Sequence, residues 1–256
     1  MENDSFLINL ENLSFSYNGR APAVENVSFR LSGKEKVGLV GPNGSGKTTL
    51  FLLTMGLIRP SSGKIELFGK RMEREEDFRE VRQRIGLLFQ DADDQLFCPT
   101  VLEDVAFGPL NQGKSGRDAR KIAVETLNSL GLNGFEDRVT HKLSGGEKRL
   151  VSLATVLAMK PEILLLDEPT TGLDTETTGR LVSILENLDL SYILISHDMD
   201  FIVQTTAKVY AMVNGRLSSE REVVPHTHVH AHDYGRLPHV HTSTEDVTPE
   251  CKDPHN

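Results

Sequence analysis

At 256 residues the chain is long enough to bury a sizeable core, and 38% hydrophobic and 25% charged residues are ordinary for a globular protein. A formal net charge of −9 argues against a nucleic-acid-binding surface, and no apolar run reaches the length of a membrane span. The first residues lack the basic start of a signal peptide, so we expect a cytoplasmic protein with free thiols at Cys98 and Cys251.

The first third of the chain alternates apolar and polar residues, which is typical of half-buried strands. Asn18-Gly19 is a hairpin turn signal between the first two of these segments. An apolar stretch with helical character lies at residues 48–57. The strands expected here are at residues 6–17, 24–31, 36–40, 65–69 and 85–89.

From residue 91 to about 160, helical spacing replaces the strand pattern, for example at residues 119–130. Apolar strands that suit a sheet buried on both faces then return, at residues 163–166, 192–195, 209–213 and 215–217. Beyond residue 222 the sequence is polar, rich in histidine and without periodicity. We expect an α/β domain over residues 1–222, with a helical subdomain of about residues 91–160 inserted in it, and a flexible tail over residues 223–256.

A glycine-rich loop stands between the strand predicted at residues 36–40 and the helix predicted at 48–57. Successive N–H groups of such a loop, together with the positive end of the following helix, suit the charges of a triphosphate. Lys47 would reach the β- and γ-phosphates, and the Thr48 hydroxyl would bind Mg²⁺. The sequence therefore predicts a nucleoside triphosphate site. The loop consists of Gly41, Pro42, Asn43, Gly44, Ser45, Gly46, Lys47, Thr48 and Thr49.

Two acids follow the apolar strand at residues 163–166, and they suit the hydrolysis of a triphosphate. Asp167 is placed to hold Mg²⁺ through its water shell. Glu168, one step further on, is placed to polarise a water for attack on the γ-phosphorus. The structural alternative is a pair of solvated charges at the rim of a sheet.

A second phosphate cradle is predicted where a helix begins at Ser144. This residue suits an N-cap, and Gly145 and Gly146 let a phosphate approach the first N–H groups. The structural alternative is a capping box between Ser144 and Glu147, and this capping box can exist together with the phosphate cradle. A single chain needs only one cradle for one nucleotide.

Six motifs occur in the order and rough spacing of ATP-binding-cassette (ABC) ATPases, and this resemblance covers about residues 5–220. It implies a P-loop NTPase core with an antiparallel β subdomain and an inserted helical subdomain, and an ATPase activity that uses ATP and Mg²⁺. The motifs are the loop at residues 41–49, Gln90, LSGGE at 143–147, LLLDE at 164–168, TTGLD at 170–174 and ISHD at 195–198.

The resemblance implies roles for residues around the chain's own nucleotide. Tyr17 matches the aromatic residue that stacks on adenine, although it also suits a half-buried strand. Gln90 matches the glutamine that contacts Mg²⁺ or water and senses a transmembrane partner. Glu168 matches the catalytic base, and His197 matches the histidine that holds both the γ-phosphate and Glu168.

The resemblance also implies that the sites are shared between two cassettes. Ser144, Gly145 and Gly146 match the signature that closes over the ATP of the other subunit, and Asp174 matches the acid that communicates across the dimer. Glu147 departs from many relatives, which have glutamine there. Because the chain holds one set of motifs, we expect it to pair with a second copy of itself or with a paralogous ATPase.

The sequence around residues 91–110 and 143–169 resembles energy-coupling-factor (ECF) transporter ATPases, most closely the cobalt/nickel importer subunits (CbiO/NikO type). This implies a membrane coupling (T) component and a substrate-binding membrane component as partners, a place on the cytoplasmic face of the membrane, and no nucleic-acid partner. An ECF-type vitamin importer is the alternative. A non-transport ABC ATPase of DNA repair or of ribosomes fits less well, because this acidic chain has neither a coiled-coil insertion nor twin cassettes.

Histidines of the C-terminal tail bear on the cargo, since seven of the nine histidines follow residue 225. Imidazole suits nickel, cobalt, zinc and copper. The alternatives are a solvated or pH-responsive tail, or a fusion remnant. Candidate nickel or cobalt ligands are His226, His228, His230, His232, His239 and His241.

Overall fold

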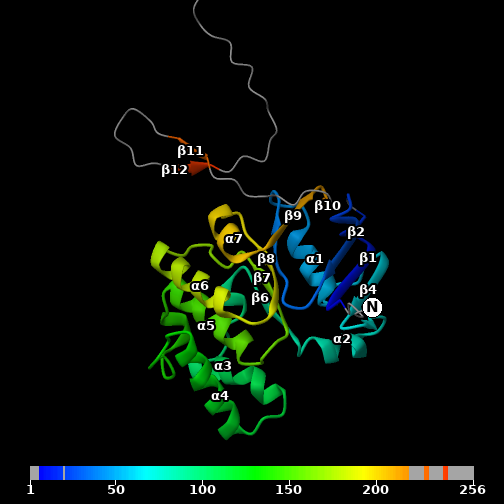
Figure 1. Ribbon diagram of the computed structural model, residues 1–256. Coiled ribbons are helices and arrows are strands. Elements are labelled where there is room, and N and C mark those ends of the chain that lie inside the picture. Colours follow the sequence, from blue (N-terminus) through cyan, green and yellow to red (C-terminus); the bar gives the residue numbers. More distant parts are fainter. Residues whose placement is uncertain (1–5, 20, 219–227, 231–238, 242–256) are drawn as a thin grey trace, which may run out of the picture.

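Two β-sheets and a lobe of helices organise this computed structural model, which describes residues 6–19, 21–218, 228–230 and 239–241 (Figure 1). The helical lobe and the N-terminal sheet lie on opposite sides of the larger sheet. Within the described residues, no helix is both long enough and apolar enough to cross a bilayer.

The smaller sheet is antiparallel, with strand order β2-β1-β4-β5. Alternation in β2 buries Val27, Phe29 and Leu31, and the residues between them are exposed. The turn before β2 has positive φ angles at Asn18 (44°) and Gly19 (71°), which agrees with the predicted turn signal. The strands are β1 (Ile8–Phe15), β2 (Val24–Leu31), β4 (Ser62–Leu67) and β5 (Lys70–Arg71).

The larger sheet has the order β10-β9-β3-β8-β7-β6, and every neighbouring pair except β10 and β9 is parallel. Strands β7 and β8 are buried along their whole length, which explains their nearly continuous apolar sequence. The strands are β3 (Lys36–Val40), β6 (Ile85–Leu88), β7 (Ile163–Asp167), β8 (Ser191–Ile195), β9 (Lys208–Val213) and β10 (Arg216–Ser218).

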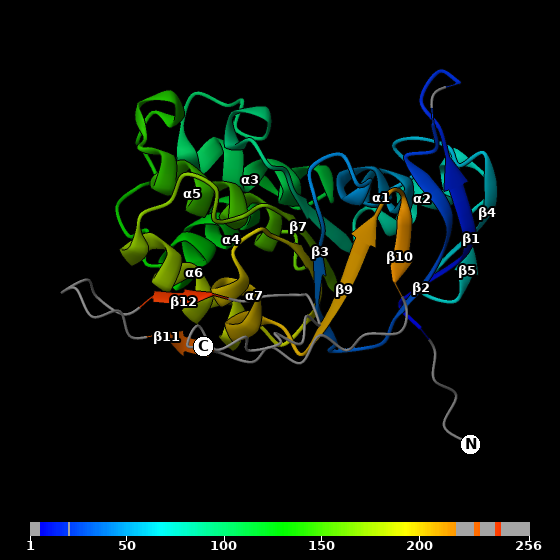
Figure 2. The same cartoon turned by 90° about the horizontal axis from the view of Figure 1, so that it is seen from above.

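Helices cover both faces of the larger sheet, as Figure 2 shows from above. Successive side chains of β7 alternate between two core clusters: Leu165 packs with α1, whereas Leu164 and Leu166 pack with α6 and α7. The sheet is therefore held from two sides by apolar packing. These helices are α1 (Lys47–Thr54), α6 (Thr175–Asn187) and α7 (Met199–Thr205), and α2 (Glu75–Val81) lies near the smaller sheet.

Three helices form the lobe: α3 (Val101–Asn111), α4 (Gly116–Ser129) and α5 (Gly145–Leu157). They share an apolar cluster that includes Val105, Leu127 and Val151. Each begins at a Ser or Thr N-cap whose side chain accepts a hydrogen bond from the first turn. All three lie within residues 91–160, the stretch expected to be the helical subdomain. Its boundaries, and the one at residue 222, stay predictions.

The expected α/β fold with an antiparallel sheet and a helical lobe is confirmed. Sequence analysis assigned no helix at α2, α3, α6 or α7. Helix α7 spans only seven residues, too few for a helical period to be recognised. Helix α6 does carry apolar residues at helical spacing, Leu181, Ile184 and Leu185, and sequence analysis did not use this pattern.

The predicted flexible tail, residues 223–256, lies outside the described residues apart from two short strands. These are β11 (His228–His230) and β12 (His239–His241), which pair antiparallel. Sequence analysis assigned no element there, although each His-Val-His triplet has the two-residue period of a strand.

Candidate functional site

A cavity of about 750 Å³ lies at the carboxyl ends of β3, β7 and β8. The carboxyl ends of adjacent parallel strands meet at one edge of a sheet, which is where open α/β sheets bind ligands. Most of the residues predicted for the nucleotide site line this cavity. They are Tyr17, Asn43, Gly44, Ser45, Gly46, Lys47, Thr48, Thr49, Gln90, Asp167, Glu168 and His197.

Two glycines of the loop are required by close backbone contacts. Gly41 has φ 149°, and a Cβ there would lie 2.0 Å from the carbonyl oxygen of Met212. Gly46 has φ 105°, and a Cβ there would lie 2.0 Å from the carbonyl oxygen of Ala23. The loop is thus pressed against neighbouring strands, and it leads directly into α1 with Gly46 as the N-cap residue.

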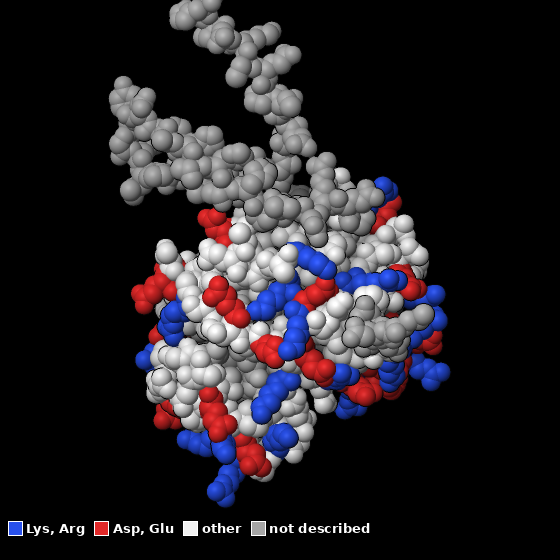
Figure 3. All heavy atoms as spheres, viewed as in Figure 1, with Lys and Arg blue, Asp and Glu red and all other residues white. Residues whose placement is uncertain are grey.

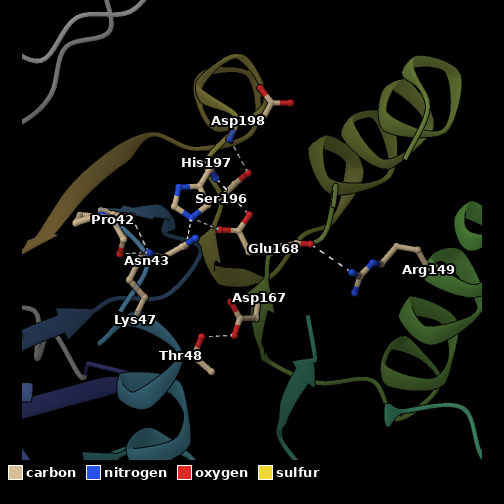
Figure 4. A network of polar contacts seen from close by, with 11 residues as sticks. Pro42, Asn43, Lys47, Thr48, Arg149, Asp167, Glu168, Ser196, His197 and Asp198 are labelled. Carbon is tan, nitrogen blue, oxygen red and sulfur yellow. Dashed lines mark hydrogen bonds and ion pairs between the residues drawn. The ribbon is translucent and has the colours of Figure 1, made fainter. Parts of the chain in front are cut away.

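Lys47 is buried to 6% exposure and points back over the loop. Its Nζ donates to the carbonyl oxygens of Gly41 at 2.7 Å and Pro42 at 3.1 Å (Figure 4). Burial lowers the pKa of this ammonium group, and the nearby carboxylates of Glu168 and Asp167 oppose that shift. Lys47 is a desolvated cation at the floor of the cavity, where it suits phosphate oxygens.

Oxygen donors meet beside Lys47 in a set that fits Mg²⁺. Thr48 Oγ1 donates to Asp167 Oδ2 at 2.7 Å, and Gln90 lines the same cavity. Burial raises the pKa of Asp167, while the Thr48 hydrogen bond, Lys47 and Arg149 lower it. Hydroxyl, amide and carboxylate oxygens are ligands that Mg²⁺ prefers. Within residues 6–19 and 21–218, no group of three or more His, Cys, Asp and Glu side chains is arranged to hold a metal.

Glu168 and His197 lie next to each other in the lining of the cavity, and Asn43 contacts His197 (Figure 4). The backbone N–H of His197 donates to Glu168 Oε2 at 3.3 Å. The imidazole Nε2 of His197 pairs with Asn43 Oδ1 at 2.9 Å. Glu168 Oε1 lies 3.1 Å from the same Nε2, yet it is buried and no described donor is aligned with it. One imidazole N–H serves one acceptor well, so Glu168 keeps an oxygen for another donor, such as a water.

Tyr17 and Gln90 lie at the edges of this cavity. The Tyr17 hydroxyl pairs with Thr49 Oγ1 at 3.3 Å, and its ring is 42% exposed. Gln90 also lines a second cavity of about 670 Å³, together with Gly145 at the start of α5. Gln90 therefore stands between the loop and the helical lobe.

Ser144, Gly146 and Asp174 do not line the cavity around Lys47. Ser144 caps α5, and Glu147 Oε2 accepts from the Ser144 backbone N–H at 2.8 Å and hydroxyl at 2.9 Å. Asp174 caps α6 by accepting from the Thr177 N–H at 2.7 Å. Gly145, by contrast, lines the second cavity together with Thr48 of the loop. That the predicted signature serves the ATP of another subunit stays a prediction.

Arg149 is a residue of this region that sequence analysis missed. It is buried to 4% exposure, and its guanidinium donates to the backbone carbonyls of Phe89 (2.6 Å), Gln90 and Glu168 (3.3 Å). Burial lowers its pKa, and the charges of Asp91 and Asp167 oppose that shift. Arg149 links α5, which begins at the predicted signature, to Gln90 and to Glu168. A basic residue near a helix start gave no signal of three distant carbonyl partners.

Strand, glycine loop and helix around Lys47, with an acid pair at the end of a neighbouring parallel strand, define a P-loop nucleotide-hydrolysing domain. Residues 24–171, more than half of the chain, match the ABC transporter family. The energy-coupling factor transporter ATP-binding protein EcfA of Methanothermobacter thermautotrophicus is 43% identical over 218 residues, which cover 84% of this chain and 70% of that protein. The chain therefore belongs to the ABC transporter family, and it is an ABC-type ATPase.

Solved structures agree with this assignment. The cbiO1 protein of Clostridium perfringens, part of the ABC transporter complex cbiONQ, is 34% identical with a TM-score of 0.75, over 84% of this chain and 87% of that one. A cassette in a dimeric, post-hydrolysis state bound to ADP and Pi is 25% identical with a TM-score of 0.77, over 84% and 98% of the two chains.

Arg149→Met should leave the carbonyl groups of Phe89, Gln90 and Glu168 without this donor and uncouple α5 from Glu168. We expect kcat for ATP to fall by about 10- to 100-fold, while the nucleotide dissociation constant changes by less than about threefold. Arg149→Lys should restore little, because an ammonium cannot match the planar fork of donors. Steady-state kinetics and nucleotide binding test this, and an equal loss of affinity and kcat would contradict a positioning role.

Asp167→Asn should stabilise the nucleotide-free protein, because the neutral amide keeps an acceptor for Thr48 and removes a buried charge. The folded-state pKa of Asp167 is raised, so ionisation costs stability as pH rises through it. The difference in melting temperature between the variant and wild type should therefore be largest near pH 8 and shrink as pH falls. Melting curves from pH 5 to 8 test this sign; a difference that grows toward low pH would refute it.

Proposed function

We propose that this chain is the ATP-hydrolysing subunit of a membrane importer for cobalt or nickel ions. It acts as a pair of cassettes, formed with a second copy of itself or with a paralogous ATPase, at the cytoplasmic face of the cell membrane. A membrane coupling component and a substrate-binding membrane component are its partners. The ATPase of an ECF-type vitamin importer is the second candidate, because the EcfA relative carries the general ECF name.

The oxygen that Glu168 keeps without an aligned donor carries the hydrolytic part of the proposal. In the proposed reaction this carboxylate orients and partly deprotonates the attacking water, which contributes typically about 10²- to 10⁴-fold to a rate. His197, held by Asn43, keeps the carboxylate in position and reaches the γ-phosphate.

Binding of ATP rests on the loop and on Lys47. The ammonium exchanges the carbonyls of Gly41 and Pro42 for phosphate oxygens, and the N–H groups at the start of α1 add their partial positive charge. Mg²⁺, held by Thr48, Gln90 and Asp167, would neutralise charge on the β- and γ-phosphates. Tyr17 provides an exposed ring beside the loop for the adenine.

An apolar groove of about 310 Å³ supports the proposal that a membrane coupling component binds this chain. It lies against α3 and is lined by Phe89, Phe97 and Phe107, all of which are exposed. The rings of Phe97 and Phe107 meet edge to face at 4.8 Å, and the Phe97 side chain is 64% exposed. An apolar groove of this kind suits a short amphipathic helix of the coupling component.

The likeness to cbiO1 supports the metal cargo, and the histidines of the tail add to it. Nucleic acid is not an expected partner. On the face of the described residues drawn in Figure 3, Lys and Arg alternate with Asp and Glu rather than gathering into a basic stripe.

Glu168→Gln should keep ATP binding and lose most turnover, by about 10²- to 10⁴-fold, so that a closed dimer with trapped ATP accumulates. Lys47→Ala should instead weaken ATP binding by roughly 10- to 100-fold, since it removes a charge-assisted contact. Glu186→Gln, at an exposed acid on α6, is the matched control and should behave as wild type. Steady-state hydrolysis rates and size-exclusion chromatography with ATP test these expectations. Near-normal turnover of Glu168→Gln would contradict the proposal that Glu168 is the catalytic base.

The cargo is tested by uptake in cells that lack their own cobalt and nickel importers and that express this chain with its membrane partners. Labelled Ni²⁺ or Co²⁺ should accumulate, and Glu168→Gln should abolish this. Truncation after Val224 should leave basal ATPase activity intact, because every catalytic motif precedes residue 200. It should reduce uptake mainly when external metal is scarce. Uptake of a labelled vitamin without metal uptake would transfer the proposal to the second candidate.

A further inference from the structure

Two donors that line the cavity are held by oxygens of three consecutive loop residues. Lys47 Nζ donates to the carbonyl oxygens of Gly41 at 2.7 Å and Pro42 at 3.1 Å. His197 Nε2 pairs with the side-chain oxygen Oδ1 of the next residue, Asn43, at 2.9 Å (Figure 4). The loop thus gives an ammonium and an imidazole three oxygen acceptors, the same kind of partner that the oxygens of a phosphate would offer.

The larger sheet brings Asn43 and His197 together, although 154 residues separate them in sequence. Strands β3 and β8 are parallel neighbours with Leu39 opposite Ile195, so the segments that follow them leave the same edge of the sheet. The His197 side chain is 49% exposed, and both residues line the cavity of about 750 Å³. Their contact is therefore open to a ligand that enters this cavity.

The Asn43 oxygen takes up the one donor that this imidazole nitrogen has. An amide oxygen only accepts, so its pairing with Nε2 places the ring proton on that nitrogen. Glu168 Oε1 lies 3.1 Å from Nε2 but has no aligned donor among the described residues. Phosphate oxygens are acceptors as well. The Nε2–H of His197 can therefore serve Asn43 or a phosphate well, but not both at once.

We propose that Asn43 is a positioning residue that stands in for the γ-phosphate while the site lacks one: its Oδ1 holds the Nε2–H of His197 until ATP displaces it. This inference rests on the proposed contact between His197 and the γ-phosphate. ADP lacks that phosphate and leaves the contact between Asn43 and His197 in place, whereas ATP must break it. A contact that exists only without the γ-phosphate weakens the binding of ATP relative to that of ADP.

The ratio of the dissociation constant of ADP to that of an ATP analogue isolates this contact. Lys47 is expected to reach the β-phosphate, which both nucleotides carry, so both displace its ammonium from the loop carbonyls. General damage to the loop would likewise change both dissociation constants. The ratio responds to groups that distinguish a nucleotide with a γ-phosphate from one without it.

Calorimetry on the full chain with ADP and with a non-hydrolysable ATP analogue, each with Mg²⁺, tests the inference. Asn43→Ala should raise the ratio about two- to tenfold, the net worth of one hydrogen bond, because the analogue no longer has to displace the amide oxygen. Asn128→Ala, at an exposed asparagine of α4, is the matched control and should leave the ratio as in wild type. Size-exclusion chromatography checks that all the proteins are monomeric at the concentration used.

A double variant separates this inference from the proposed function on which it rests. Adding His197→Ala to Asn43→Ala removes the γ-phosphate contact alone, and it should lower the ratio about tenfold or more, since that bond is charge-assisted. An unchanged ratio at this step would contradict the proposed contact of His197 with the γ-phosphate. A normal drop at this step, together with a ratio in Asn43→Ala that is equal to or below that of wild type, would overturn the stand-in role of Asn43 alone.

Nuclear magnetic resonance gives a second readout that a general effect on the loop would not reproduce. In the empty protein, Asn43→Ala should shift the ¹⁵N resonance of His197 Nε2, because this nitrogen loses its acceptor; His197→Ala identifies the resonance by its loss. With the analogue bound, wild type and Asn43→Ala should give the same resonance, because the imidazole then donates to phosphate in both. Equal shifts in the empty and the bound state would overturn the inference.

Discussion

The parallel pairing of β3, β8 and β7 is the constraint on which the site depends. Each of these strands ends in a segment that carries chemistry: the glycine loop after β3, Asp167 and Glu168 at the end of β7, and His197 after β8. Because parallel neighbours end at the same edge, segments separated by more than a hundred residues meet there. The apolar clusters on the two faces of the sheet hold that edge in place.

The site concentrates charge where water is largely excluded, and this works against the stability of the empty protein. Lys47, Asp167, Glu168 and Arg149 are each at most 8% exposed. Burial disfavours the charged forms of both Lys47 and Asp167. The opposite charge of each residue offsets only part of that desolvation cost for the other. Such strain is common at functional sites, and here the surrounding core offsets it.

The predictable parts of the fold and of the site are those that depend on residues close together in the sequence. Lys36–Val40 and Val24–Leu31 have the bounds that their patterns predicted, and the loop residues line one cavity. Arg149 was not predictable, since its partners are carbonyls of three residues, two of them about sixty positions away. Helix α7 was not predictable either, since seven residues are too few for a helical period to be recognised.

The close contacts of Gly41 and Gly46 have a consequence for the thermodynamics of nucleotide capture. The loop is wedged between Ala23, at the start of β2, and the turn from β9 to β10, where the Gly215 N–H donates to the Ser45 carbonyl at 3.0 Å. A flexible glycine-rich loop would lose conformational entropy on closing around phosphates. This one is already held in shape by both sheets, so little of the interaction energy with phosphate is consumed in ordering it.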